Sequence, residues 1–147
     1  MHISSAKIAD LLQPHKKNLQ EIKKLTVDEK EELYRTGYAL YSSGEYRKAS
    51  YLFSYLVLSD PLIGCSWHGL ASCKQVLEEY SAAIEAWNVV CKLQPQDPLG
   101  YFHAAEYYLY IKQKKEALQK LDKAEKLSSE DLLLQNRIQI LKSTHGN

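Results

Sequence analysis

The sequence lacks an excess of charge of either sign. Its 147 residues carry 19 lysines and arginines against 18 aspartates and glutamates, so the formal net charge is only +1. Proteins that bind nucleic acids usually carry a clear basic excess, and no nucleic-acid partner is therefore expected. The lysines between positions 112 and 126 alternate with acidic residues such as Glu116 and Asp122, which is typical of a solvated helix face.

Long apolar runs are missing as well. No segment approaches the ~20 consecutive apolar residues that span a bilayer, so membrane insertion is not expected. The opening stretch MHISSAKIADLLQPHKK has no apolar run followed by a small-residue cleavage site, and it does not resemble a secretory signal. These observations predict a cytoplasmic protein.

Residue patterns that carry enzymatic chemistry are absent too. The five histidines show no metal-ligand spacing with the cysteines, and we recognise neither a glycine-rich phosphate loop nor a Ser/His/Asp arrangement. The three cysteines, Cys65, Cys73 and Cys91, are an odd number without CxxC spacing, which favours reduced thiols. Cys65 and Cys73, eight residues apart on one predicted helix, are expected to be core thiols. The sequence therefore predicts no enzyme, no cofactor and no metal.

What the sequence does contain is a repeat with a period of 34 residues. Ala49, Ala83 and Ala117 are separated by 34 residues each, and a large apolar side chain follows four residues after each of them. Small residues also stand twelve positions before each alanine, at Gly37, Ala71 and Ala105. The register runs through three copies without an insertion or a deletion.

This pattern resembles the tetratricopeptide repeat, W-x₂-L-G-x₂-Y…A-x₃-F…P, in which two antiparallel helices form each copy. We therefore predict an all-α protein with three tandem repeats, at residues 30–63, 64–97 and 98–131. An N-terminal helical segment, 1–29, precedes them, and a C-terminal capping helix with a tail, 132–147, follows. Aromatic residues such as Tyr46, Phe53 and Trp87 are expected to fill the space between the helices.

Local signals mark where helices begin. Thr26 to Glu29 forms a capping box, and Asp60-Pro61 and Asp97-Pro98 each place an acceptor before a proline that lacks an amide hydrogen. Ser128 or Ser129 is expected to cap the final helix. A stripe at i, i+4 and i+7 of that helix is expected to cover the open face of the last repeat; it consists of Leu134, Ile138 and Leu141.

The first helices of such repeats line the concave side of a curved stack. The predicted groove positions are Tyr34, Tyr38 and Tyr41 in copy one, His68, Ser72 and Gln75 in copy two, and Phe102, Glu106 and Leu109 in copy three. Tyrosine offers apolar area and a hydroxyl at little cost in rotamer entropy, which suits an extended apolar peptide. The alternative is that the three tyrosines pack against a neighbouring part of the protein itself.

The N-terminal segment also leaves two interpretations open. Its two short amphipathic pieces either pack against the first repeat or form a dimerisation or docking segment. Their apolar residues are Ile8, Leu11, Leu12, Leu19, Ile22 and Leu25.

Beyond the general repeat, the stretches LYRTGYALYSSGEYRKA, GLASCKQVLEEYSAAI and above all YFHAAEYYL resemble the class II chaperones of bacterial type III secretion. The resemblance covers about residues 30–128. Members of that family keep hydrophobic translocator subunits soluble in the cytoplasm, and their concave surface binds a short extended segment with Pro and Leu anchors. The resemblance therefore implies a groove with Tyr34, Tyr38, Tyr41, Tyr46, His68 and Phe102, and a dimerisation role for the segment from Ile8 to Leu25.

Two other functions remain possible at the level of sequence. The groove could hold the needle subunit of the same secretion system, whose bound segment would be an amphipathic helix. Alternatively, the protein could be a scaffold or regulatory adaptor that joins folded proteins.

Overall fold

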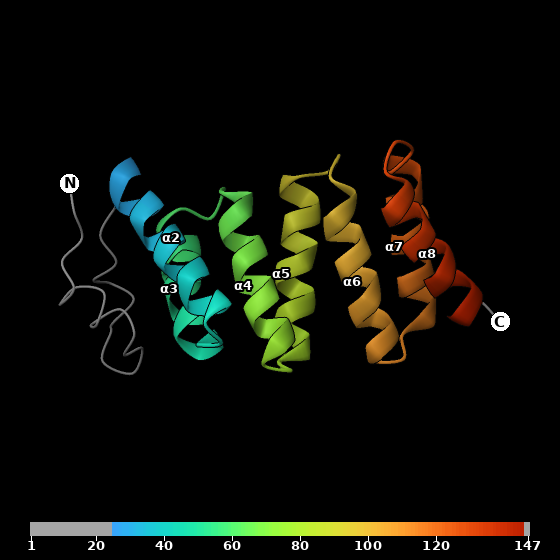
Figure 1. The fold of residues 1–147 in the computed structure, drawn as a ribbon, viewed down its shortest axis with the longest axis horizontal. Coiled ribbons are helices and arrows are strands. Elements are labelled where there is room, and N and C mark those ends of the chain that lie inside the picture. Colours follow the sequence, from blue (N-terminus) through green and yellow to red (C-terminus); the bar gives the residue numbers. More distant parts are fainter. Residues whose placement is uncertain (1–24, 146–147) are drawn as a thin grey trace. The chain divides into compact units, whose positions relative to one another are not determined.

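The computed structural model describes residues 25–145, which form seven α-helices and contain no strand. The helices are α2 (Val27–Ser42), α3 (Tyr46–Ser59), α4 (Gly64–Val76), α5 (Tyr80–Leu93), α6 (Pro98–Tyr110), α7 (Lys114–Leu127) and α8 (Leu132–His145) (Figure 1). The all-α class predicted from the repeat is confirmed. No described helix is long and apolar enough to cross a membrane.

The chain divides into two compact units, one ending at Glu79 and the other beginning at Tyr80. The amino-terminal unit contains α2, α3 and α4, and the carboxy-terminal unit contains α5 to α8. The division falls inside the predicted second repeat, 64–97. The three repeat boundaries remain a prediction.

The helices begin with the same 34-residue period as the sequence. The first residues of α4, α6 and α8 are Gly64, Pro98 and Leu132, and the second helices α3, α5 and α7 begin at residues 46, 80 and 114. The helix α8 thus starts where a fourth first-type helix would start.

The three turns that follow α2, α4 and α6 share one backbone conformation, again 34 residues apart. Gly44, Glu78 and Lys112 have φ angles of 85°, 59° and 63°. In each turn the next amide donates to a carbonyl five residues back, as Glu45 N does to Leu40 O at 2.8 Å. This arrangement is a Schellman motif, which satisfies carbonyls at a helix end through one left-handed residue. Only the first copy uses glycine at that position.

Two of the predicted caps are confirmed and two are wrong. Thr26 Oγ1 accepts from Glu29 N at 3.2 Å while Glu29 Oε1 accepts from Thr26 N, and Asp97 Oδ1 accepts from Leu99 N at 2.9 Å. Asp60 instead closes α3, because its amide donates to Leu56 O. The helix α8 is capped by Asp131, which accepts from Leu134 N at 3.0 Å, and not by Ser128 or Ser129.

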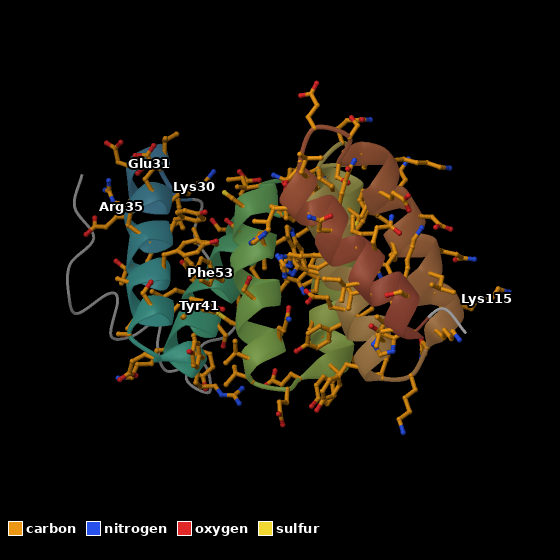
Figure 2. The ribbon with its side chains drawn as sticks, turned by 45° about the vertical axis from the view of Figure 1, so that its right-hand side comes forward. Lys30, Glu31, Arg35, Tyr41, Phe53 and Lys115 are labelled. Carbon is orange, nitrogen blue, oxygen red and sulfur yellow. The ribbon has the colours of Figure 1, made fainter. Side chains whose placement is uncertain are left out.

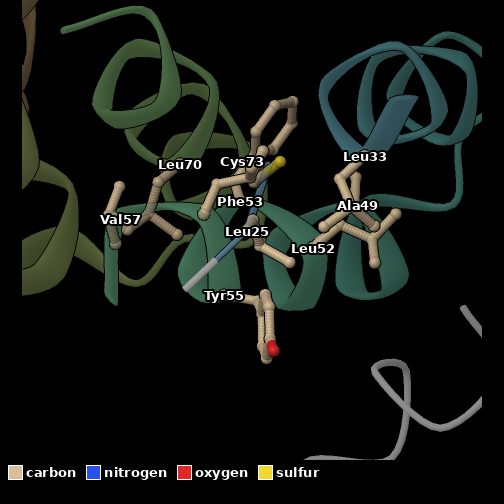
Figure 3. Packing of buried hydrophobic residues seen from close by; sticks show 10 residues of the cluster. Leu25, Leu33, Ala49, Leu52, Phe53, Tyr55, Val57, Leu70 and Cys73 are labelled. Carbon is tan, nitrogen blue, oxygen red and sulfur yellow. The ribbon is translucent and has the colours of Figure 1, made fainter. Parts of the chain in front are cut away.

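The core of the amino-terminal unit is built around the ring of Phe53, which is fully buried (Figure 3). An added Cβ at Gly37 would lie 2.9 Å from Phe53 Cζ, and one at Gly69 would lie 2.5 Å from Phe53 Cε1. Only glycine on both α2 and α4 leaves room for this ring. The cluster also contains Leu33, Leu52, Leu70 and other buried side chains, among them Tyr55 and Cys73.

The core of the carboxy-terminal unit joins α6, α7 and α8 and includes Cys91 of α5. Leu134 and Ile138 of α8 are buried and Leu141 packs against the same cluster, as the stripe predicted. Their partners in the cluster include Phe102, Ala105 and Leu121. Figure 1 shows α8 beside α7 at the end of this unit.

Two further predictions are corrected by burial. Leu25, placed in the dimerisation segment, is only 4% exposed and belongs to the amino-terminal core. Cys65, expected in the core, is exposed, whereas Cys73 and Cys91 are buried. All three cysteines are free thiols, as their number and spacing indicated. The remaining residues predicted for dimerisation, Ile8, Leu11, Leu12, Leu19 and Ile22, lie outside the described residues.

Candidate functional site

The aromatic side chains predicted to line a groove lie together on the amino-terminal unit. Tyr34 and Tyr38 are one turn apart on α2, and their ring centroids are 4.8 Å apart. Tyr38 meets Phe53 edge-on at 5.2 Å, and Tyr41 meets Tyr46 of α3 edge-on at 5.2 Å. Edge-to-face pairs at these distances are favourable, because the positive ring edge faces the negative ring face.

These tyrosines are partly buried and partly open. Tyr34, Tyr38 and Tyr41 pack against the core cluster with one side and keep the other side accessible. Burial raises the pKa of the Tyr34 hydroxyl well above its ordinary value, and a hydrogen bond with Tyr38 adds to the shift. Burial likewise raises the pKa of Tyr41. Both phenols therefore stay neutral at physiological pH and keep their hydrogen-bonding protons.

A pocket of about 550 Å³ adjoins Tyr34. Its apolar lining comes from all three helices of the unit and from the loop before α4, and it consists of Val27, Tyr34, Leu56, Ile63 and Cys65. Charged side chains form part of the same lining: Lys30, Glu31, Arg35 and Asp60. Lys30 Nζ lies 2.9 Å from Asp60 Oδ2 and so joins α2 to the end of α3. Figure 2 shows Lys30, Glu31 and Arg35 on α2.

Most of these pocket residues were missed by the sequence analysis, although a signal was present. Glu31 and Cys65 stand three residues before Tyr34 and His68, which were assigned to the groove. One helical turn separates such positions, so they share a face. Extending the register by one turn would have found both.

The copy-two positions lie on α4 of the same unit. His68, Ser72 and Gln75 are all partly buried, and Ser72 Oγ donates to His68 O at 2.9 Å. Tyr34 of α2 and Cys65 of α4 line the same pocket, and Gly37 and Gly69 of these helices both lie against the Phe53 ring, so α2 and α4 are side by side here. The structure therefore brings together the predicted residues of copies one and two.

The copy-three positions belong to the carboxy-terminal unit, and one of them needs correction. Phe102 is only 1% exposed and is part of the core, so its ring does not lie on an open surface. The guanidinium carbon of Arg137 from α8 lies 4.5 Å from the centre of this ring. Glu106 Oε1 pairs with His103 Nδ1 at 2.9 Å, and Leu109 is partly buried. A single groove through both units remains a prediction.

Comparison with curated sequences finds relatives in Yersinia. The low calcium response locus protein H of Yersinia pestis is 30% identical over 88 residues, and so is the protein of the same name from Yersinia pseudotuberculosis. The match covers 60% of this chain and 52% of the relative. The chain therefore spans about half the length of the curated relatives that it matches. No protein-family model matches the chain.

Solved structures extend the match to most of the chain. The type III secretion chaperone SycD of Yersinia enterocolitica, solved with a peptide of the translocator YopD, superposes with a TM-score of 0.80 at 26% identity, over 84% of this chain and 97% of SycD. PcrH of Pseudomonas aeruginosa shares the fold, with a TM-score of 0.79 at 24% identity over 86% of this chain and 98% of PcrH. In fold and in sequence this chain is similar to the class II translocator chaperones of type III secretion, as its motifs predicted.

Proposed function

We propose that this protein is a bacterial cytoplasmic chaperone of type III secretion that binds an apolar segment of a hydrophobic translocator subunit. The observation that carries the proposal is the aromatic surface of α2 beside the 550 Å³ pocket. This surface occurs on a chain similar to SycD, which has been solved with a translocator peptide. The pocket supports the proposal of a site for an apolar anchor, and the similarity to SycD supports the proposed class of client.

The surface suits an extended peptide with apolar side chains. An anchor such as Leu or Pro would gain about 1.5–3 kcal/mol on full burial between Tyr34, Leu56 and Ile63. The neutral tyrosine hydroxyls can form hydrogen bonds with the peptide backbone, which has an acceptor at every residue and a donor at every residue except proline. The charged side chains around the pocket keep the empty surface hydrated.

The proposed mechanism is sequestration without chemistry. Covering the client's apolar anchors prevents its aggregation and its premature insertion into a membrane. The proteins that this chain resembles are chaperones. Because the secretion machinery must remove the client, we expect moderate affinity.

We also propose how the chain is organised. Residues 30–131 form the three repeats that carry the client surface, and the segment from Ile8 to Ile22 mediates a homodimer. A dimer of SycD among the similar structures supports the second proposal. Leu25 is excluded from that role by its burial.

The exposed thiol of Cys65 allows a test of peptide binding on the wild-type protein. Cys65 lines the pocket, whereas Cys73 and Cys91 are buried, and burial raises the pKa of Cys73 to about 12 and also raises the pKa of Cys91. Iodoacetamide should therefore modify Cys65 selectively, because the reactive species is an accessible thiolate. An extended peptide with Pro and Leu anchors should slow this alkylation at least fivefold at saturation, as measured by mass spectrometry.

Two variants, tested for binding of a fluorescently labelled form of the same peptide, provide the control. Cys65→Arg places a large charged side chain in the pocket and should weaken binding at least tenfold. Leu58→Arg adds the same charge at an exposed position outside the pocket lining and should leave binding unchanged. Circular dichroism must show both variants folded. Alanine at Tyr34 or Tyr38 is less suitable, because these rings also pack on Phe53.

Three other results would contradict the proposed site or favour an alternative function. Unprotected Cys65 together with normal binding to Cys65→Arg would refute this site. A client that gains helicity on binding would favour the needle-subunit alternative. A partner that is stable and soluble without this protein would favour the adaptor.

A further inference from the structure

The carboxy-terminal unit contains a second pocket that shares no residue with the predicted groove. Its volume is about 510 Å³, and side chains from α5, α6 and α7 line it. The lining includes Asn88, Lys92, Tyr101, Tyr108 and Lys120. Tyr108 belongs to the YFHAAEYYL stretch, but the proposed client surface does not use it.

Hydrogen-bond donors without acceptors converge on this pocket. The hydroxyl of Tyr108 accepts from Asn88 Nδ2 at 3.1 Å, and its own proton has no acceptor among the described residues. Lys120 Nζ lies 5.6 Å from the centre of the Tyr101 ring. Neither Lys92 nor Lys120 has a carboxylate within 4 Å among residues 25–145. By contrast, Lys30, Lys74 and Lys142 all form ion pairs.

The same corner contains an unsatisfied polar atom. The side-chain oxygen of Asn88 is buried and has no donor. Buried polar atoms without a partner are uncommon in folded proteins, and each calls for a physical explanation. A bound peptide segment would provide one, since its backbone N–H groups can donate to this oxygen.

The walls of the pocket indicate what kind of anion fits. The ring of Tyr101 and the side chains of Cys91 and Pro95 contribute apolar surface next to the two ammonium groups. A carboxylate on a short aliphatic stem matches this combination, because its methylene groups contact the apolar wall while its oxygens accept charge-assisted hydrogen bonds. A bare phosphate would use the charges alone.

We propose that this pocket binds the carboxylate side chain of an acidic peptide segment, with Lys92, Lys120 and Tyr108 as donors. The site would give a partner protein a polar contact on the carboxy-terminal unit. It does not depend on the proposed client surface, because its residues and its ligand chemistry are different.

The test is a titration of the ¹⁵N-labelled full chain followed by amide chemical shifts. The probes are the capped peptide acetyl-Gly-Glu-Gly-amide, its Gln counterpart and inorganic phosphate. We expect saturable shifts around residues 88–92, 101, 108 and 120 with the Glu peptide, and at least tenfold weaker binding of the Gln peptide. Lys92→Gln/Lys120→Gln should weaken binding of the Glu peptide at least tenfold, since each charged hydrogen bond contributes about a factor of ten.

Two further variants separate a specific site from general attraction. Lys115→Gln/Lys126→Gln removes the same charge outside the pocket lining and should retain the affinity; Figure 2 labels Lys115 on α7. Tyr108→Phe keeps the ring and removes the hydroxyl, which is the proposed donor and also the acceptor for Asn88 Nδ2, and it should weaken binding several-fold with spectral changes in the free protein confined to the surroundings of Asn88 and Tyr108. Equal binding of the Glu and Gln peptides, equal losses in both lysine pairs, tighter binding of phosphate, or no saturable shift would each overturn the proposal.

Discussion

At the scale of single residues, the ring of Phe53 determines which residue types fit at two positions of the neighbouring helices. It lies against Gly37 of α2 and Gly69 of α4, and neither position has room for a methyl group. The sequence pattern indicated a small residue at Gly37, because the tetratricopeptide repeat has glycine there. The same requirement at Gly69 arises from contact with the next helix, and the repeat pattern does not contain it.

We therefore predict that Gly69→Ala destabilises the protein by about 1–3 kcal/mol, because overpacking outweighs the better helix propensity of alanine. Urea unfolding followed by circular dichroism measures this change. The double variant Phe53→Leu/Gly69→Ala should lose less than the sum of the two single variants, since the smaller side chain relieves the clash. A Gly69→Ala protein as stable as the wild type would contradict the packing account.

Burial of single residues was also harder to predict than their helices. Phe102 was assigned to the groove by its register, yet it is buried beneath Arg137 and the apolar face of α8. Cys65 was assigned to the core because cysteine is often buried, yet it is exposed near the start of α4. The burial of each residue depends on which other element packs against its helix face, and the 34-residue period does not contain that information.

At the scale of elements, the 34-residue register explains both the confirmed and the incorrect helix caps. The period aligns Asp60-Pro61 with Gln94-Pro95 in the loops, whereas Asp97-Pro98 aligns with Ile63-Gly64 at a helix start. It likewise aligns Asp131 with Asp97, and both cap the helix that follows. The local Asp-Pro motif alone was therefore ambiguous, and the register would have resolved it.

The turns offer a test at the same scale. Glu78 and Lys112 adopt positive φ angles, as Gly44 does in the first turn. For a residue with a Cβ atom, this left-handed conformation costs about 1–2 kcal/mol. We expect Glu78→Gly and Lys112→Gly each to raise the free energy of unfolding by about 0.5–1 kcal/mol, after the entropy of glycine in the unfolded chain is subtracted. Thermal unfolding measures this gain.

The matched control is Glu85→Gly, at an exposed position inside α5. Glycine in a helix interior should lower the stability by about 1 kcal/mol. If the turn variants lost stability as the helix variant does, the left-handed conformation would not be the cause of strain.

At the scale of the whole molecule, ion pairs fasten neighbouring helices within each unit. Glu79 pairs with Lys74 and with Arg47 of α3, and these two partners lower its pKa below the ordinary value. Lys142 of α8 pairs with Glu125 and with Asp122 of α7, and it lowers the pKa of Glu125. A carboxylate whose pKa is lower in the folded state contributes stability above its unfolded pKa and loses it on protonation.

We accordingly expect stability to fall as the pH decreases from about 4.5, the ordinary value for glutamate, through the lower folded pKa values. Lys74→Gln and Lys142→Gln should each reduce this dependence, because the pKa of the partner glutamate then returns toward its ordinary value. Urea midpoints measured between pH 3 and pH 7 test this. The effect should be small, since these pairs are partly exposed and screened. An unchanged slope in both variants would contradict the assignment.

The sequence by itself determined the all-α class, the period of the helices, the capping box at Thr26 and the family resemblance. These features depend on residue types at fixed spacing along the chain. They follow from hydrophobic periodicity and from hydrogen bonds between residues close in sequence, both of which can be read from the sequence. The tertiary structure decided which faces remain open, where the two pockets lie, and which predicted groove residues are buried. These properties arise from contacts between side chains far apart in sequence, such as Arg137 on Phe102, and from residues such as Tyr34 and Cys65 that line one pocket; no local pattern fixes such arrangements.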